Sequence, residues 1–121
     1  MHDLTPQVRK TIADSAILTG TVNVFNVGST AAVGTIEFEP GLQEDLPAVL
    51  DRLIPASRNY GHEQAWHDGN AHSHLRAAIL GRNIAVGVNN GELTLGRFQS
   101  VIFAELDGPR TREINLQVIG E

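Results

Sequence analysis

The chain has 121 residues, of which 41% are apolar and 19% are charged, and its net charge is −5. This length suits one domain, and the composition is that of a folded protein rather than a disordered one, so we expect a single domain over residues 1–121. The absence of cysteine excludes disulfides, thiolate zinc sites and cysteine nucleophiles.

The charge pattern and the lack of long apolar runs exclude some classes of binding partner. Eight arginines and one lysine are scattered along the chain, and aromatic residues make up 5%. Proteins that bind duplex DNA usually cluster their basic residues, so we do not expect nucleic acid as a partner. No apolar run reaches the roughly 18 residues that a membrane span needs, so we expect no membrane partner. Residues 1–10 lack the apolar core of a secretion signal, which leaves a cytoplasmic location as the expectation.

The first third of the chain predicts one helix followed by two strands. Thr5-Pro6 predicts a helix start, with Thr5 as the N-cap. Gly20 indicates a break. The β-branched residues that alternate in 21–27 predict a strand, and 31–38 reads as the strand that returns beside it.

The middle third predicts helices on either side of a loop. Leucines at helical spacing follow Pro40-Gly41, and they place Pro47 in about the first turn of that helix, where its missing N–H is tolerated. Residues 56–70 are polar and read as loop. Residues 70–80 predict a second helix, with Gly81 at its C-terminus.

The last third reads as strands. Asn89-Asn90-Gly91 between 84–88 and 92–95 predicts a hairpin with a primed turn. Residues 98–106 form a long apolar strand, and 113–118 alternate as a half-buried strand. Antiparallel strands that carry helices indicate an α+β fold.

One short polar window holds most of the candidate chemistry. Four of the five histidines fall within thirteen residues, together with acids and an amide: His62, Glu63, His67, Asp68, Asn70, His72 and His74. The window could be a solvated loop that leads into a helix, a metal site, an acid–base pair or part of a phosphate site.

Geometry separates these alternatives. If residues 68–80 are helical, His72 and His74 point apart, while Asp68 shares a face with His72 and Asn70 shares one with His74. Asp68 could then orient His72 as an acid or base. If the segment is extended, the two histidines point the same way and could bind zinc or a similar ion.

Other residues could complete a site for a phosphorylated ligand. Gly28-Ser29-Thr30 offers hydroxyls and backbone N–H groups that suit an anion, although it could equally be an ordinary turn. Arg76 and Arg110 could supply positive charge. Trp66 could anchor its loop or cover a heterocyclic substrate. Glu39 could face the histidines.

Several stretches of the chain resemble the motifs of a known family. The run from Trp66 to Ala77 resembles the signature of the YjbQ-like family, also called the secondary thiamine-phosphate synthase family. Further stretches agree in order and spacing: Ser29–Ala32, Glu39–Leu42, Leu95-Gly96, Glu105–Arg110 and Ile119–Glu121. The resemblance runs from Leu4 to the C-terminus.

The resemblance implies a fold, an assembly and an activity. The fold is an α+β sandwich of mixed or antiparallel sheets with helices, and members form homotrimers. The activity is a weak thiamine phosphate synthase reaction, which joins a hydroxymethylpyrimidine diphosphate to a thiazole phosphate and releases pyrophosphate. The partners would then be phosphorylated small molecules. The alternative is a non-catalytic trimer that binds a metal or a phosphorylated metabolite.

The resemblance places His62, Asp68, Asn70, His72 and His74 in the polar cluster of the family and matches Glu39 to its Glu-Pro-Gly motif, and together with the residue chemistry above it suggests the following roles. The catalytic residues would be Glu39, Asp68, His72 and His74. The residues that bind substrate or phosphate would be Ser29, Thr30, Asn70 and Arg76. The ligands of a divalent metal would be His62, Asp68, His72 and His74, near a subunit boundary. Histidine ligands favour zinc, whereas a diphosphate substrate favours magnesium.

Two departures from the family pattern stand out. Many members have a histidine and a threonine where this chain has Gly28 and Ser29. The family also has a strand before the first helix, and this chain reads as lacking it. Such a loss would leave a sheet edge unpaired unless another subunit covers it.

Overall fold

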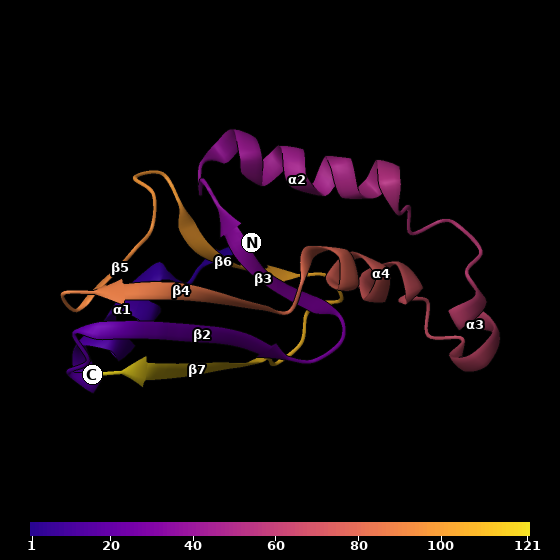
Figure 1. Ribbon diagram of the computed structural model, residues 1–121. Helices are drawn as coiled ribbons and strands as arrows, with labels where there is room; N and C mark the ends of the chain where they lie inside the picture. Colours follow the sequence, from indigo (N-terminus) through magenta and orange to yellow (C-terminus); the bar gives the residue numbers. More distant parts are fainter.

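A computed structural model describes residues 1–121, and it has two antiparallel sheets and four helices (Figure 1). This confirms the predicted α+β class. In chain order the elements are β1 (His2–Asp3), α1 (Thr5–Ser15), β2 (Thr19–Val27), β3 (Ala31–Ile36), α2 (Pro40–Leu53), α3 (Gly61–Trp66), α4 (Ala71–Leu80), β4 (Asn83–Asn89), β5 (Glu92–Leu93), β6 (Ser100–Glu105) and β7 (Glu113–Gly120). None of these helices combines the length and the apolarity that crossing a bilayer requires.

The two sheets divide strands that are neighbours in sequence. One sheet has the order β1-β6-β3 and the other the order β5-β4-β2-β7. The expectation that residues 31–38 return beside 21–27 is therefore wrong, because β3 pairs with β6, with Ala31 opposite Glu105. The first three residues of β3 are all buried. A strand covered on both faces needs no alternating pattern, so sequence spacing alone did not identify its partner.

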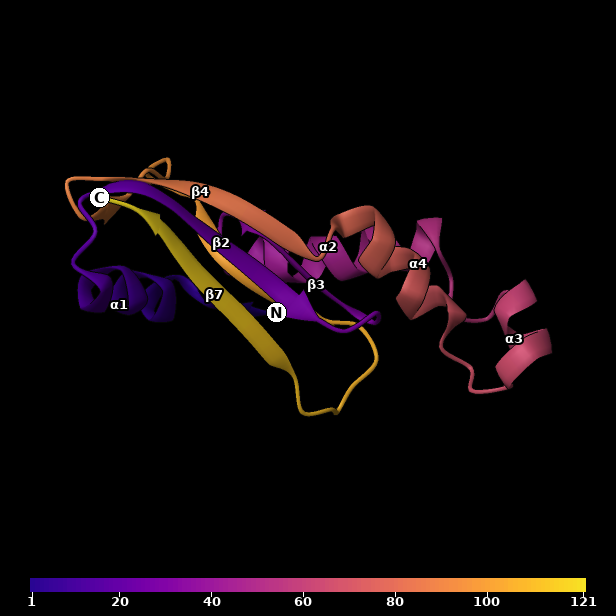
Figure 2. The ribbon, with the colours of Figure 1, turned by 60° about the horizontal axis from the view of Figure 1, so that its bottom comes forward.

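The main core lies between the sheets and α1. Its fully buried side chains include Val22 of β2, Val33 of β3 and Val101 of β6. The predicted stripe of Val8 and Ile12 on α1 packs into this core, and Figure 2 shows α1 on the side of the sheet where β2 begins and β7 ends. Each such side chain stabilises the fold by about 1.5–3 kcal/mol.

Two details of the helices correct the sequence analysis. The N-cap of α1 is Leu4, and the Thr5 hydroxyl instead accepts a hydrogen bond from the Val101 N–H at 3.0 Å. The threonine thus ties α1 to β6. Pro47 lies in the interior of α2, not in its first turn, because the helix begins at Pro40.

Glycines shape the end of the four-stranded sheet where β2 begins and β4 ends. Asn90 and Gly91 have φ values of 51° and 75°, which confirms the primed turn between β4 and β5. Gly20 does not break the chain but lies inside β2, paired with Gly120. A Cβ at Gly20 would lie 2.1 Å from the Ile119 carbonyl oxygen, so only glycine permits this close approach.

The chain contains two short elements that sequence spacing did not predict. Helix α3 occupies part of the expected loop, and it lies beyond α4 at one end of the molecule, away from both sheets (Figures 1 and 2). Strand β1 precedes α1 and pairs with β6 through His2 and Asp3. A two-residue strand is too short to leave a periodic signal.

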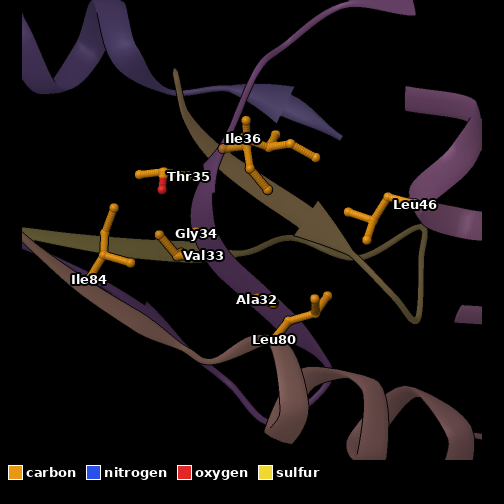
Figure 3. A pocket seen from close by; sticks show the side chains of 9 residues that line it. Ala32, Val33, Gly34, Thr35, Ile36, Leu46, Leu80 and Ile84 are labelled. Carbon is orange, nitrogen blue, oxygen red and sulfur yellow. The ribbon is translucent and has the colours of Figure 1, made fainter. Parts of the chain in front are cut away.

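Helix α2 is loosely packed. Within its span only Leu50 is buried. An open cavity of about 320 Å³ lies between α2, β3 and the end of α4. Figure 3 shows Leu46 of α2 and Leu80 of α4 pointing toward β3. The cavity lining is almost entirely apolar.

Candidate functional site

The first turn of α4 is docked onto the segment that follows β6. Ser73 is fully buried, and its hydroxyl donates to the Leu106 carbonyl. The Asn70 side chain is also buried, and its Nδ2 donates to the Asp107 carboxylate at 3.0 Å. These two bonds set the position of the histidine-bearing helix relative to the three-stranded sheet.

Asn70 stands at the N-cap of α4 but does not cap it. Asparagine is a favoured N-cap, yet its side chain here turns to Asp107. Glu63 of α3 caps the helix instead, because its carboxylate accepts from the N–H groups of Gly69 at 2.7 Å and Ala71 at 3.0 Å. The Oδ1 of Asn70 is buried without a partner. A tertiary contact thus outweighs the local preference.

Three of the predicted site residues lie together. His62 Nε2 is 3.4 Å from the Asp68 carboxylate, and the rings of His62 and His74 have centroids 4.6 Å apart. The predicted pairing of Asp68 with His72 is wrong. Helix α4 begins only at Ala71, so Asp68 lies before the helix and turns toward α3.

The predicted metal ligands do not form a metal site within one chain. His72 lies on the helix, with Nε2 3.4 Å from the Ser73 hydroxyl, and diverges from His74. No three histidine or acidic side chains of the chain are arranged to hold an ion. The set of His62, Asp68, His72 and His74 is therefore not assembled in the single subunit, because helical spacing separates two of its members.

Glu39 lies elsewhere. Its carboxylate accepts from the N–H of Gly41 at 2.8 Å and from the N–H of Leu42, and so caps α2. The start of α2 is the end remote from α3 (Figure 1). Within one chain, Glu39 does not join the histidines as was expected. The Pro40-Gly41 pair was expected to fix the direction of Glu39. In the structure the Glu39 carboxylate points to the N–H groups at the start of α2 and caps that helix.

The two arginines expected to meet phosphate are engaged in other contacts. Arg76 donates from Nε and Nη2 to the Ile54 carbonyl, at 3.0 and 2.7 Å, and from Nη2 to Asp51 at 2.8 Å. It thereby joins α4 to the C-terminal end of α2. Arg110 pairs with Asp107 at 3.1 Å and is half-exposed.

The turn of Ser29 and Thr30 is held by two other arginines. Arg82 donates to the Ser29 carbonyl at 3.3 Å. Arg112 donates to the Thr30 hydroxyl at 3.0 Å and to the Thr30 carbonyl at 3.2 Å. The turn therefore lies beside two guanidinium groups, which suits the binding of an anion.

Sequence reasoning missed the ion pair of Glu105 and Arg112. The Arg112 Nε donates to Glu105 at 2.7 Å, and both side chains are largely buried. The hydrogen bond from Arg112 lowers the pKa of Glu105 despite its burial, and the backbone N–H of Asp107 lowers that pKa further. The same bond raises the pKa of Arg112. In the sequence, the only indication of this ion pair is Glu105, an acid at the end of an otherwise apolar strand.

Trp66 is exposed rather than anchored beneath its loop. Its side chain is 73% exposed at the end of α3, and neighbouring His67 is exposed too. Within one chain it covers no pocket. Its role as a cover for a substrate stays a prediction.

Known proteins similar to this chain share its fold along its whole length. A family profile described as "UPF0047 protein YjbQ-like" matches residues 1–121. A UPF0047 protein of Methanothermobacter thermautotrophicus is 43% identical over 119 residues, which cover 98% of this chain and 82% of that one. The UPF0047 protein YugU of Bacillus subtilis is 30% identical, over 99% of this chain and 89% of that one.

Solved structures agree with these matches. A crystal structure described as a YbjQ-like protein of unknown function from Sulfolobus solfataricus has a TM-score of 0.94 at 36% identity, covering 99% of this chain and 86% of that one. A hypothetical protein of Aeropyrum pernix has a TM-score of 0.93 at 35% identity, covering 99% and 88%. The chain therefore belongs to the YjbQ-like family of UPF0047 proteins.

Proposed function

We propose that the protein is a transferase that joins a heterocyclic phosphate to a second heterocycle carrying a diphosphate, with release of pyrophosphate, as in thiamine phosphate synthesis. The support is the resemblance of residues 66–77 to the signature of that family, together with one structural observation. The end of β6 links the Ser29–Thr30 turn to the start of α4. Groups that suit an anion and groups that suit proton transfer thus occur on segments tied to one strand end.

The proposed roles follow from the chemistry of the groups. In the reaction a bond forms between the two heterocycles, and the bond to the diphosphate breaks with its electron pair leaving on pyrophosphate. The Ser29–Thr30 turn would meet the phosphate charge through hydroxyl and N–H groups. His72 and His74 are half-buried, and one of them would donate a proton to the departing pyrophosphate oxygen, an effect that typically contributes about 10²–10⁴-fold.

The proposal uses no metal-dependent step. The four residues expected to bind zinc or magnesium do not converge within the chain, so no role is assigned to an ion. Asp68 and His62 instead contact each other, and His62 packs against His74. We assign Asp68 and His62 the task of orienting the His74 ring.

The test of this function is direct product formation. Purified protein is mixed with hydroxymethylpyrimidine diphosphate and thiazole phosphate, and thiamine phosphate is measured by its fluorescent oxidation product. We expect His72→Ala and His74→Ala to lower turnover about 100-fold with little change in melting temperature. His2→Gln, at the distant β1 strand, is the matched control. Absence of product from the wild type would contradict the proposal.

The second candidate is a trimer that binds a phosphorylated metabolite without reaction. It is favoured by large apolar side chains exposed on α2 and α4, which suit contact between copies: Val49, Leu53, Leu75 and Ile79. The same assay separates the two candidates. A rise in melting temperature with either phosphorylated substrate, with no product formed, would support the binding protein.

A further inference from the structure

The residues that end β6 bond to both segments of the proposed site. Glu105 accepts from Arg112, the Leu106 carbonyl accepts from Ser73, and the Asp107 carboxylate accepts from Asn70. We call this set of three residues, Glu105 to Asp107, the β6 junction. Three consecutive residues therefore each bond to another segment of the chain.

Arg112 connects the junction to the Ser29–Thr30 turn. Its Nη2 donates to the hydroxyl and the carbonyl of Thr30, while its Nε donates to the Glu105 carboxylate. A planar guanidinium can make these bonds together because its donors diverge from a rigid fork. The side chain is only 12% exposed, so solvent does little to weaken them.

Glu105 connects Arg112 to α4 through Asp107. Its Oε1 also accepts from the backbone N–H of Asp107 at 2.9 Å. That bond orients the Asp107 residue whose carboxylate holds Asn70 at the start of α4. Arg112 itself has no hydrogen bond to α4, and the connection runs through the junction.

We propose that Arg112 is a positioning residue that aligns the Ser29–Thr30 turn with the first turn of α4. The effect of Arg112 on turnover rests on the proposed function, whereas its effect on the alignment does not. The alignment matters because a displacement of about 1 Å between reacting groups can cost about 100-fold in rate. Arg112 has no proposed contact with substrate.

The structural test is amide hydrogen exchange in Arg112→Ala. We expect exchange to rise about tenfold in two windows, residues 29–31 and 70–74, although Arg112 bonds only to the first. Val22→Ala, in the core of the other sheet, is the control for general destabilisation and should not single out these windows. Faster exchange at 29–31 alone would overturn the proposal.

A second variant covers the case in which Arg112→Ala does not fold. Arg112→Lys keeps the positive charge but cannot donate to Thr30 and Glu105 from a rigid fork. We expect it to loosen the same two windows to a smaller extent. An exchange pattern identical to the wild type in both windows would show that charge alone suffices, and would overturn the positioning role.

The kinetic test uses the transfer reaction. We expect Arg112→Ala to lower kcat about 10-fold or more with KM within about twofold, and added guanidinium ion at millimolar concentration to restore part of kcat. Val22→Ala should show neither effect. A kcat equal to that of Val22→Ala would contradict the positioning role. If the wild type forms no product, the proposed function fails, and the exchange experiment still decides the alignment.

Discussion

At the scale of the residue, the decisive side chains are those that bond to another segment of the chain. Asn70 has the residue type and the position of an N-cap, but it bonds to Asp107. An acid at a strand end is usually solvated, but Glu105 pairs with Arg112 and belongs to the β6 junction that holds α4. In both cases a partly buried bond to another segment replaces a local or solvated role.

The lowered pKa of Glu105 predicts a pH dependence of stability. The folded-state pKa lies below the unfolded value, so this ion pair contributes stability that is fully present above the unfolded pKa of about 4.5 and is lost as the pH falls through the folded pKa. We expect Glu105→Gln to lower the free energy of unfolding by about 1 kcal/mol at pH 7 and by less at pH 3.

Urea denaturation at the two pH values measures this change. Glu113→Gln is a suitable control, because Glu113 is an exposed strand residue. An equal loss of stability at pH 3 and pH 7 in Glu105→Gln would contradict the role of the ionised pair.

At the scale of the element, α3 depends on α4 and α4 depends on α3. Helix α3 has six residues and no buried side chain, so its own packing cannot hold it. Glu63 compensates by accepting from Gly69 and Ala71, and His62 adds contacts to Asp68 and His74. The histidine window is thus ordered by the cap from Glu63 and by the side-chain contacts of His62 rather than by a core.

This arrangement predicts the effect of removing the cap. We expect Glu63→Ala to destabilise the start of α4 by about 1 kcal/mol and to speed amide exchange at Gly69 and Ala71. The global free energy of unfolding should change less than the local one, because α3 lies outside the core. Gln64→Ala on the exposed side of α3 is the control. Unchanged exchange at both amides would contradict the capping role.

At the scale of the whole molecule, the single chain leaves apolar surface unpaired. Leu53 and Ile79 are 69% and 72% exposed, and the cavity beside α2 is open. Side chains of this kind on adjacent helices are typical of surfaces buried by association. The family resemblance implies a homotrimer, and this surface is our candidate for its contact.

The corresponding prediction concerns oligomeric state. We expect light scattering after gel filtration to give a mass three times that of the chain. Ile79→Asp should shift it toward the monomer, since a buried unpaired carboxylate is strongly unfavourable. The exposed Leu18, on the loop before β2, gives the control Leu18→Asp. A monomeric wild type would contradict the trimer.

Local spacing by itself determined the α+β class, helices α1, α2 and α4 and the hairpin turn at Asn90-Gly91. Each of these depends on periodicity or on the backbone preference of one or two residues. Local spacing left two orientations open for His72 and His74, and helix α4 decided that they diverge. Only the tertiary structure decided that β3 pairs with β6, that Glu63 caps α4, and that Asp68 contacts His62 rather than His72. These contacts join different elements of the chain, so the period of any one helix or strand carries no record of them.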